Sequence, residues 1–165
     1  MAPTRLGELL IDVVCGCEPR AQAHKVKLQL RREDPMAGQL ELQLNPQRLR
    51  EALGNLIDNA IDVSRDNSQV DIVLGLVASA RPQVFVDIVD HGSGVDAAIV
   101  SQIFEPFFTT KAVDVGTGIG QAIARRAARD HGGDVVLAAT SPQGSVFRLT
   151  LPVQPSGPVS LDALD

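Results

Sequence analysis

The chain has 165 residues, the size of one globular domain. Its net charge of −5 argues against broad electrostatic binding to nucleic acid or to anionic membranes. No apolar run approaches the ~20 residues that a transmembrane helix needs, and no leader resembles a signal peptide, so we expect a cytoplasmic protein without direct membrane contact. The two cysteines, Cys15 and Cys17, are too few for a disulfide scaffold or a zinc site. We interpret them as core or half-exposed thiols, with redox chemistry as the alternative.

The first third of the chain contains one helical and two strand-like patterns. Residues 4–23 have the apolar spacing of a helix. Residues 26–30 and 40–44 alternate strictly between apolar and polar side chains, as half-buried strands do. Pro35 and Gly38 mark a turn between these two strands. The patterns therefore predict a strand hairpin after the first helix.

A second helix is predicted to begin after Asn45, a favourable cap, with Pro46 at its first position, and to run to about Ser64. Its polar side chains fall in one wedge of the helical wheel: Arg48, Glu51, Asn55, Asp58, Asn59 and Asp62. A solvated surface explains such a wedge. Asparagine is a poor helix former, however, and its carbonyl oxygen suits Mg²⁺, so Asn55 and Asn59 also permit a metal-binding face. On this helix alone, both interpretations stand.

An acid ends the second of two strands predicted at residues 69–78 and 83–90. This acid is Asp90, and Gly92 and Gly94 follow it closely. A simple turn accounts for the pattern. In a functional interpretation, Asp90 would accept a hydrogen bond from an exocyclic amine such as that of adenine, and the glycines would make room for a flat ring.

A glycine-rich segment leads into a third helix, which is predicted over residues 118–131. The segment is Gly116, Thr117, Gly118, Ile119 and Gly120. Free amides and the positive end of a helix dipole favour phosphate, although a flexible loop is the alternative. Lys111, a short distance upstream, adds a cation that would reach a phosphate or remain solvated.

The remaining patterns complete the fold prediction. A short helix is expected at residues 97–103, and a hairpin at 135–140 and 145–151 closes the domain. We predict one domain over residues 1–154 and a loose tail over 155–165. Strands interspersed with helices, without regular β-α-β alternation, favour an α+β two-layer sandwich in which helices pack on one face of a mixed sheet.

Four of these segments, in this order, resemble the nucleotide-binding boxes of the ATP-binding catalytic domain of sensor histidine kinases. This family belongs to the superfamily of gyrase, the ninety-kilodalton chaperone and the mismatch-repair ATPases. The asparagine box matches residues 55–60, the first glycine box 90–94, the phenylalanine box 104–108 and the second glycine box 116–120. The resemblance covers about residues 4–152 and implies the Bergerat-type ATP-binding fold.

The resemblance implies ATP and Mg²⁺ as ligands. Asn59 would coordinate the metal, Asn55 would support the metal or the phosphates, and Asp90 would bind the adenine amino group. Residues 107–116 would form a lid, and we expect residues 107–117 to be mobile without nucleotide. The implied nucleotide-binding residues are Asn55, Asn59, Asp90, Gly92, Gly94, Lys111, Gly116, Thr117, Gly118, Ile119 and Gly120.

The resemblance also implies a protein histidine kinase that donates the γ-phosphate to a histidine on a separate dimerisation domain in two-component signalling. Hydrolytic relatives carry a glutamate where this chain has Asn55, so transfer is favoured over hydrolysis, and no residue of the chain is assigned as catalytic. The three histidines lack an acceptor context, and His131, before Gly-Gly, is typical of a capping or packing residue. We therefore expect a fragment without the phosphoacceptor. Its partners would be the dimerisation helices of the same kinase and a response regulator, and the parent protein could be membrane-anchored.

Four positions depart from the family pattern: Asp62, Val63, His91 and Gln121. Asp62 is expected to place an acid near the phosphates, and Val63 to remove an aromatic ring from the pocket. The alternative function is thus a degenerate or stand-alone nucleotide-binding regulatory module, including a serine kinase of the anti-sigma type. Members of that last group generally lack the 104–108 segment.

Overall fold

A computed structural model describes residues 1–105 and 120–153 of the chain. The predicted tail over 155–165 lies outside these residues. In chain order the elements are β1 (Ala2–Arg5), α1 (Leu6–Ala23), β2 (Val26–Arg32), α2 (Pro35–Gln39), β3 (Glu41–Leu44), α3 (Pro46–Val63), β4 (Ser68–Val77), β5 (Gln83–Asp90), the 3₁₀ turn η1 (Val100–Gln102), α4 (Gly120–Asp130), β6 (Asp134–Ser141) and β7 (Gly144–Pro152).

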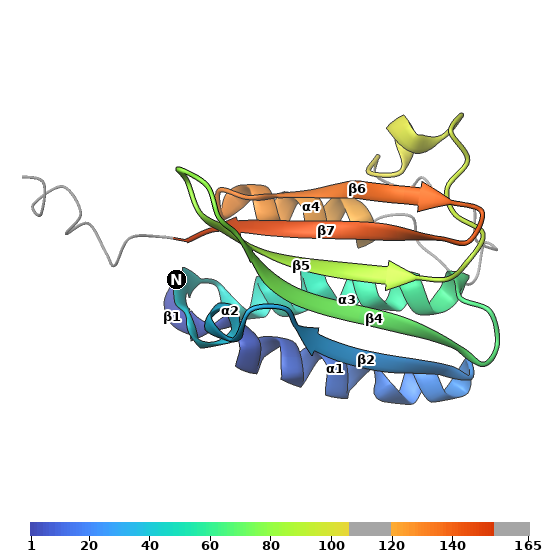
Figure 1. Cartoon of the computed structure of the whole chain (residues 1–165), viewed down its shortest axis with the longest axis horizontal. Helices are drawn as coiled ribbons and strands as arrows, with labels where there is room; N and C mark the ends of the chain where they lie inside the picture. The colour runs from blue at the N-terminus through green and yellow to red at the C-terminus, as the bar shows by residue number, and fades with distance from the viewer. Residues whose placement is uncertain (106–119, 154–165) are drawn as a thin grey trace, which may run out of the picture.

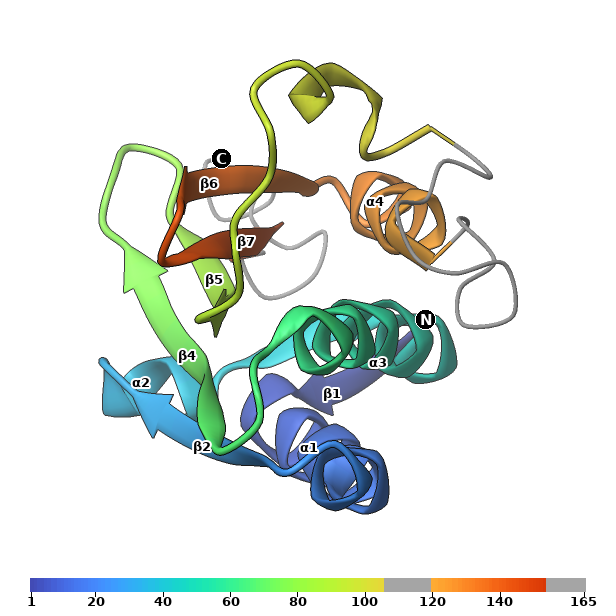
Figure 2. The same ribbon diagram turned by 90° about the vertical axis from the view of Figure 1, so that its right-hand side faces the viewer.

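The main sheet has five strands in the order β2-β4-β5-β7-β6. Strands β2 and β4 are parallel, and the other neighbours are antiparallel. Helices α1, α3 and α4 lie side by side against one face of this sheet (Figures 1 and 2). The predicted α+β sandwich with a mixed sheet and helices on one face is therefore confirmed.

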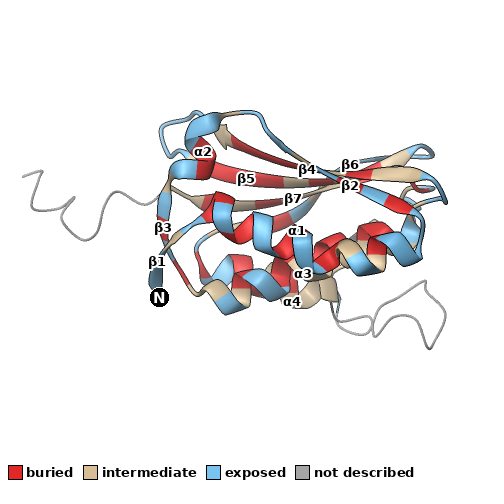
Figure 3. Ribbon diagram, turned by 90° about the horizontal axis from the view of Figure 1, so that it is seen from below, coloured by how far each residue is buried: buried red, intermediate tan, exposed pale blue. Residues whose placement is uncertain are grey.

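The core lies between the sheet and the helix layer, where the buried faces meet (Figure 3). Alternate residues of β5, namely Val84, Val86 and Ile88, point into it and are at most 1% exposed. From the other layer, α3 contributes Leu49 and Leu53 at helical spacing, both fully buried. Among the described residues, no helix has the length and apolar character to cross a membrane.

The start of α3 is held by local and distant hydrogen bonds. The Asn45 side chain accepts from the backbone N–H of Arg48 at 3.2 Å, as predicted for the cap. The buried His131, which follows α4, places Nδ1 2.7 Å from the carbonyl oxygen of Ala127, and its Nε2 accepts from the Asn45 N–H at 3.0 Å. Because the carbonyl can only accept and the amide can only donate, Nδ1 carries the proton. His131 is thus a packing residue, as predicted.

The predicted hairpin between residues 26–30 and 40–44 is wrong. Strand β2 pairs in parallel with β4, whereas β3 pairs antiparallel with β1, a strand that the sequence did not predict. The intervening turn is a short helix, α2, because Asp34 caps it by accepting from the Met36 N–H at 2.9 Å and Pro35 suits its first position. This helix separates β2 from β3. The helix predicted at 97–103 is also reduced to the 3₁₀ turn η1.

The two free cysteines differ sharply in exposure. Cys15 is exposed, whereas Cys17 is buried against α3. Burial, and then the neighbouring Asp58 carboxylate, raise the pKa of Cys17 from its ordinary 9.0 to about 12. Cys17 is therefore protonated at neutral pH and unsuited to redox chemistry.

We expect one fast-reacting thiol when the folded chain is treated with excess iodoacetamide at pH 8, and two in denaturant. A pKa of about 12 leaves roughly a thousandfold less thiolate at Cys17 than an ordinary thiol would have. Mass spectrometry of the time course measures both rates, and Cys15→Ser isolates the slow one. Equal rates at the two thiols would contradict the burial of Cys17.

Candidate functional site

Asn55 and Asn59 lie one turn apart on α3, on the side that faces the start of α4. A Cβ placed on Gly120 would lie 3.5 Å from the Cβ and Cγ of Asn55 and 3.6 Å from Nδ2 of Asn59. Both asparagines are half-buried. The fold therefore brings the asparagine box and the last residue of the second glycine box together. Five predicted site residues, and the predicted lid over 107–116, lie outside the described residues: Lys111, Gly116, Thr117, Gly118 and Ile119.

Asp90 ends β5 on the inner face of the sheet and is 4% exposed. Its Oδ1 accepts hydrogen bonds from the backbone N–H groups of Gly92, at 2.9 Å, and Ser145, at 3.3 Å. Burial raises the pKa of Asp90, and these two N–H groups counteract part of the rise. Its Oδ2 accepts no hydrogen bond from the described residues. Asp90 thus offers one fixed acceptor to a ligand.

Gly92 and Gly94 are required by close approaches within the chain. A Cβ on Gly92 would overlap the carbonyl oxygen of Val63, the last residue of α3. A Cβ on Gly94 would overlap the carbonyl oxygen of Ser141, and Gly94 also has a φ of +84°. Because these two glycines have no side chain, the loop after Asp90 packs closely against the ends of α3 and β6. Their contact with a flat ring stays a prediction.

Asp62, expected to place an acid near the phosphates, is paired with an arginine. Its side chain is 3% exposed and turns toward α1, where Arg20 grips both carboxylate oxygens. The Arg20 Nη2 lies 2.8 Å from Oδ1 and 3.0 Å from Oδ2, and Nε lies 3.2 Å from Oδ1. The polar wedge of α3 is thus divided: Asn55 and Asn59 face α4, and Asp62 faces α1.

His91, another departure from the family pattern, lies on the surface beside the site. It is half-exposed, and its Nε2 is 3.7 Å from Oδ2 of Asp71 on the neighbouring strand β4. The contact ties the loop after Asp90 to the sheet. With His91 at this position, Oδ1 of Asp90 accepts its two backbone hydrogen bonds.

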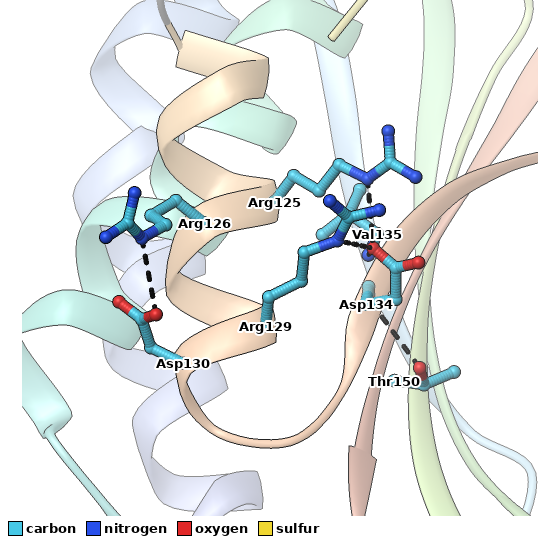
Figure 4. Close-up of polar contacts among 7 residues, drawn as sticks. All are labelled: Arg125, Arg126, Arg129, Asp130, Asp134, Val135 and Thr150. Atoms are coloured by element: carbon cyan, nitrogen blue, oxygen red, sulfur yellow. Dashed lines mark hydrogen bonds and ion pairs between the residues drawn. The ribbon is translucent and has the colours of Figure 1, made fainter.

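A cluster that sequence reasoning missed joins Phe104 to α4, and Figure 4 shows the α4 arginines of this cluster beside Asp134. The guanidinium carbon of Arg125 lies 4.7 Å from the centre of the Phe104 ring, and that ring meets Phe147 edge-on at 6.1 Å. Arg125 and Arg129 both reach Oδ1 of Asp134, at 3.0 Å and 3.2 Å. The cluster holds α4, whose first residue lies beside Asn55, against β6. In the sequence, the only sign of this cluster is that the helix predicted at residues 118–131 is rich in arginine. The residues that these arginines contact cannot be identified from the sequence, because they lie in other elements.

The family model described as "Histidine kinase-, DNA gyrase B-, and HSP90-like ATPase" matches residues 44–155. Among curated proteins, the signal transduction histidine-protein kinase AtoS of Escherichia coli (strain K12) is 33% identical over 109 residues, which are 66% of this chain and 17% of AtoS. The sensor histidine kinase ZraS of the same strain is 32% identical over 133 residues, which are 81% of this chain and 27% of ZraS. The chain thus spans well under a third of either relative.

Solved structures of histidine kinases are also similar to this chain. The nucleotide-free catalytic domain of histidine kinase ThkA has a TM-score of 0.77 and 27% identity, covering 94% of this chain and 100% of that one. Full-length ShkA in complex with AMPPNP has a TM-score of 0.76 and 26% identity, covering 95% of this chain and 32% of ShkA.

Proposed function

Because the chain belongs to the histidine kinase-, DNA gyrase B- and HSP90-like ATPase family, we propose that it binds Mg-ATP and donates the γ-phosphate to a histidine on a separate dimerisation domain. It would act as the catalytic module of a cytoplasmic or membrane-anchored sensor kinase, with a response regulator as the downstream partner. The observation that carries the proposal is that Gly120 lies against Asn55 and Asn59 of α3, while Gly92, whose N–H donates to Asp90, lies against the last residue of the same helix.

In this proposal the two ends of the nucleotide are held by different chemistry. Oδ2 of Asp90 accepts the exocyclic amine of adenine, beside a loop that Gly92 and Gly94 keep close to the protein. The phosphates lie at the start of α4, where unpaired helix amides favour anions. Gly120 and the residues before it contact them: Lys111, Gly116, Thr117, Gly118 and Ile119.

The side chains beside Gly120 fit Mg²⁺. Asn55 and Asn59 present half-buried amides on adjacent turns, and Mg²⁺ takes few protein oxygens while it keeps waters and phosphate ligands. Asn59 would hold the ion, with Asn55 in support. When bound, Mg²⁺ would neutralise part of the negative charge of the phosphates.

The acceptor in this proposal comes from outside the chain. Asn55 stands where a water-activating base would be needed, and an amide cannot remove a proton. His131 uses both ring nitrogens inside the fold. Transfer breaks the bond between the γ-phosphorus and the ADP oxygen and forms a phosphorus–nitrogen bond to the incoming imidazole. One argument for the alternative, a degenerate nucleotide-binding module, was that Asp62 places an acid near the phosphates. The pairing of Asp62 with Arg20 weakens that argument.

We expect Mg-ADP and Mg-ATP to bind the chain, and Asp90→Asn to weaken binding by about 1–3 kcal/mol, roughly 5- to 150-fold in Kd, because the amide presents a mismatched partner to the adenine amine. Isothermal titration calorimetry measures this, since the chain has no Trp or Tyr for fluorescence. Asp66→Asn, at an exposed turn, is the matched control. Absence of heat at about 10 mM nucleotide would reject the function, and equal binding by Asp90→Asn would reject the adenine role of Asp90.

A further inference from the structure

A charged seam joins α1 to α3. It consists of Arg20, His24, Asp58 and Asp62. Asp62 is its centre, with the Arg20 fork on both oxygens and the His24 Nε2 3.9 Å from Oδ1. The Arg20 Nε is also 3.9 Å from Oδ1 of Asp58, one turn earlier on α3. The side chain of Asp62 is 3% exposed and that of Arg20 is 40% exposed, so the pair is partly buried at the interface.

The seam fixes how α3 sits on α1. Most buried side chains of the two helices are aliphatic, such as Leu10, Val14, Leu53 and Ile57, and apolar contacts of this kind tolerate small shifts. The other ion pair between the helices among the described residues, Arg50 to Asp12, is exposed and longer, at 3.8 Å. A two-oxygen fork has a set direction and length, so it specifies register more than it adds stability. Its position on α3 matters because Asp62 belongs to the last turn of the helix.

The last turn of α3 packs against the loop that follows Asp90. The carbonyl of Val63, the residue after Asp62, packs so closely on Gly92 that no side chain fits between them. The Gly92 N–H in turn donates to Oδ1 of Asp90 at 2.9 Å. A shift of the last turn of α3 would therefore move Gly92 and rotate the Asp90 carboxylate, whose Oδ2 accepts no hydrogen bond from the described residues.

We propose that Arg20 and Asp62 are positioning residues for base recognition: their fork holds Val63 against Gly92 and so orients Asp90 toward a 6-amino purine. The inference rests on the proposed nucleotide binding and adds the determinant that distinguishes adenine from a 6-oxo purine. In this proposal, neither Arg20 nor Asp62 touches the nucleotide.

The test compares Mg-ADP with Mg-IDP, which carries a 6-oxo group, by calorimetry on the full chain. The main variant is Arg20→Met/Asp62→Leu, because replacing both members of an ion pair together leaves no unpaired charge at Asp62, the buried end of this pair. We expect it to stay folded by circular dichroism while its preference for ADP over IDP falls about two- to tenfold, the cost of one misaligned hydrogen bond. Arg20→Lys, which keeps the charge without the fork, should fall between this variant and the parent.

The matched control is Arg48→Met, which breaks another arginine–aspartate pair of α3 (Arg48 to Asp130, 2.8 Å) at the opposite end of the helix. It should keep the parent's preference for ADP. A double variant with the parent's preference, whatever its melting temperature, overturns the positioning role alone. A parent chain that binds neither nucleotide overturns the proposed function and this inference together, so the two failures are distinguishable.

Discussion

Replacing Asn59 by alanine is expected to slow phosphotransfer to a histidine supplied in trans by at least about a hundredfold, because the variant lacks the amide oxygen proposed to hold Mg²⁺ beside the phosphates. The fold should tolerate the change, since Asn59 is half-buried and alanine is the better helix former. The assay adds a sensor-kinase dimerisation helix pair to the chain with radiolabelled ATP and follows acid-labile label on the helices.

The matched control is Gln47→Ala, which removes an exposed amide from the first turn of the same helix and should label the helices at the parent's rate. Adenine binding through Asp90 should survive in Asn59→Ala, so its loss of transfer should exceed its loss of ADP affinity. Transfer at the parent's rate would reject Asn59 as the metal ligand. Acid-labile label on the isolated parent chain would reject the need for an external histidine.

The elements that the sequence predicted well are those whose determinants are local. Asn45 and Pro46 mark the start of α3 because capping and proline geometry act within one turn. Strand β5 and the closing β6–β7 hairpin fall close to their predicted bounds, since alternation and the turn between them are read from neighbouring residues.

The errors concern partners that lie far apart in the sequence. Alternation shows that residues 26–30 form a strand, yet it contains nothing about whether that strand pairs with β3 or β4. The helical wheel likewise places Asp62 among the polar residues of α3 without showing that Arg20, 42 residues earlier, covers it. Such choices depend on how layers pack, which periodicity does not encode.

The candidate site shows the same division. Asn55, Asn59 and Asp90 could be identified from the asparagine box and the first glycine box, because the residue types and spacing of these boxes are visible in the sequence. The sequence could not show that Gly92 faces the end of α3, because that depends on where two elements cross in space. A glycine between functional residues therefore has two explanations, ligand access and backbone crowding, and only the fold weighs them.

Backbone crowding makes Gly94→Ala a severe change. We expect it to lower the free energy of unfolding by at least about 2 kcal/mol, because alanine resists a φ of +84° and its Cβ would overlap the Ser141 carbonyl oxygen. Relief would require the loop to leave β6, which would also break the hydrogen bond from the Val95 N–H to Thr140 at 2.8 Å. Urea denaturation followed by circular dichroism measures the difference.

Gly16→Ala provides the control of opposite sign. Gly16 is an exposed position in α1 with nothing within 4 Å of the added Cβ, so alanine should raise the free energy of unfolding by about 0.5–1 kcal/mol through its better helix propensity. The two variants make the same chemical change, one methyl group on a glycine, and differ only in backbone conformation and neighbours. If both shift stability in the same direction, or if Gly94→Ala stays within about 0.5 kcal/mol of the parent, the close approach of the Asp90 loop to β6 is wrong.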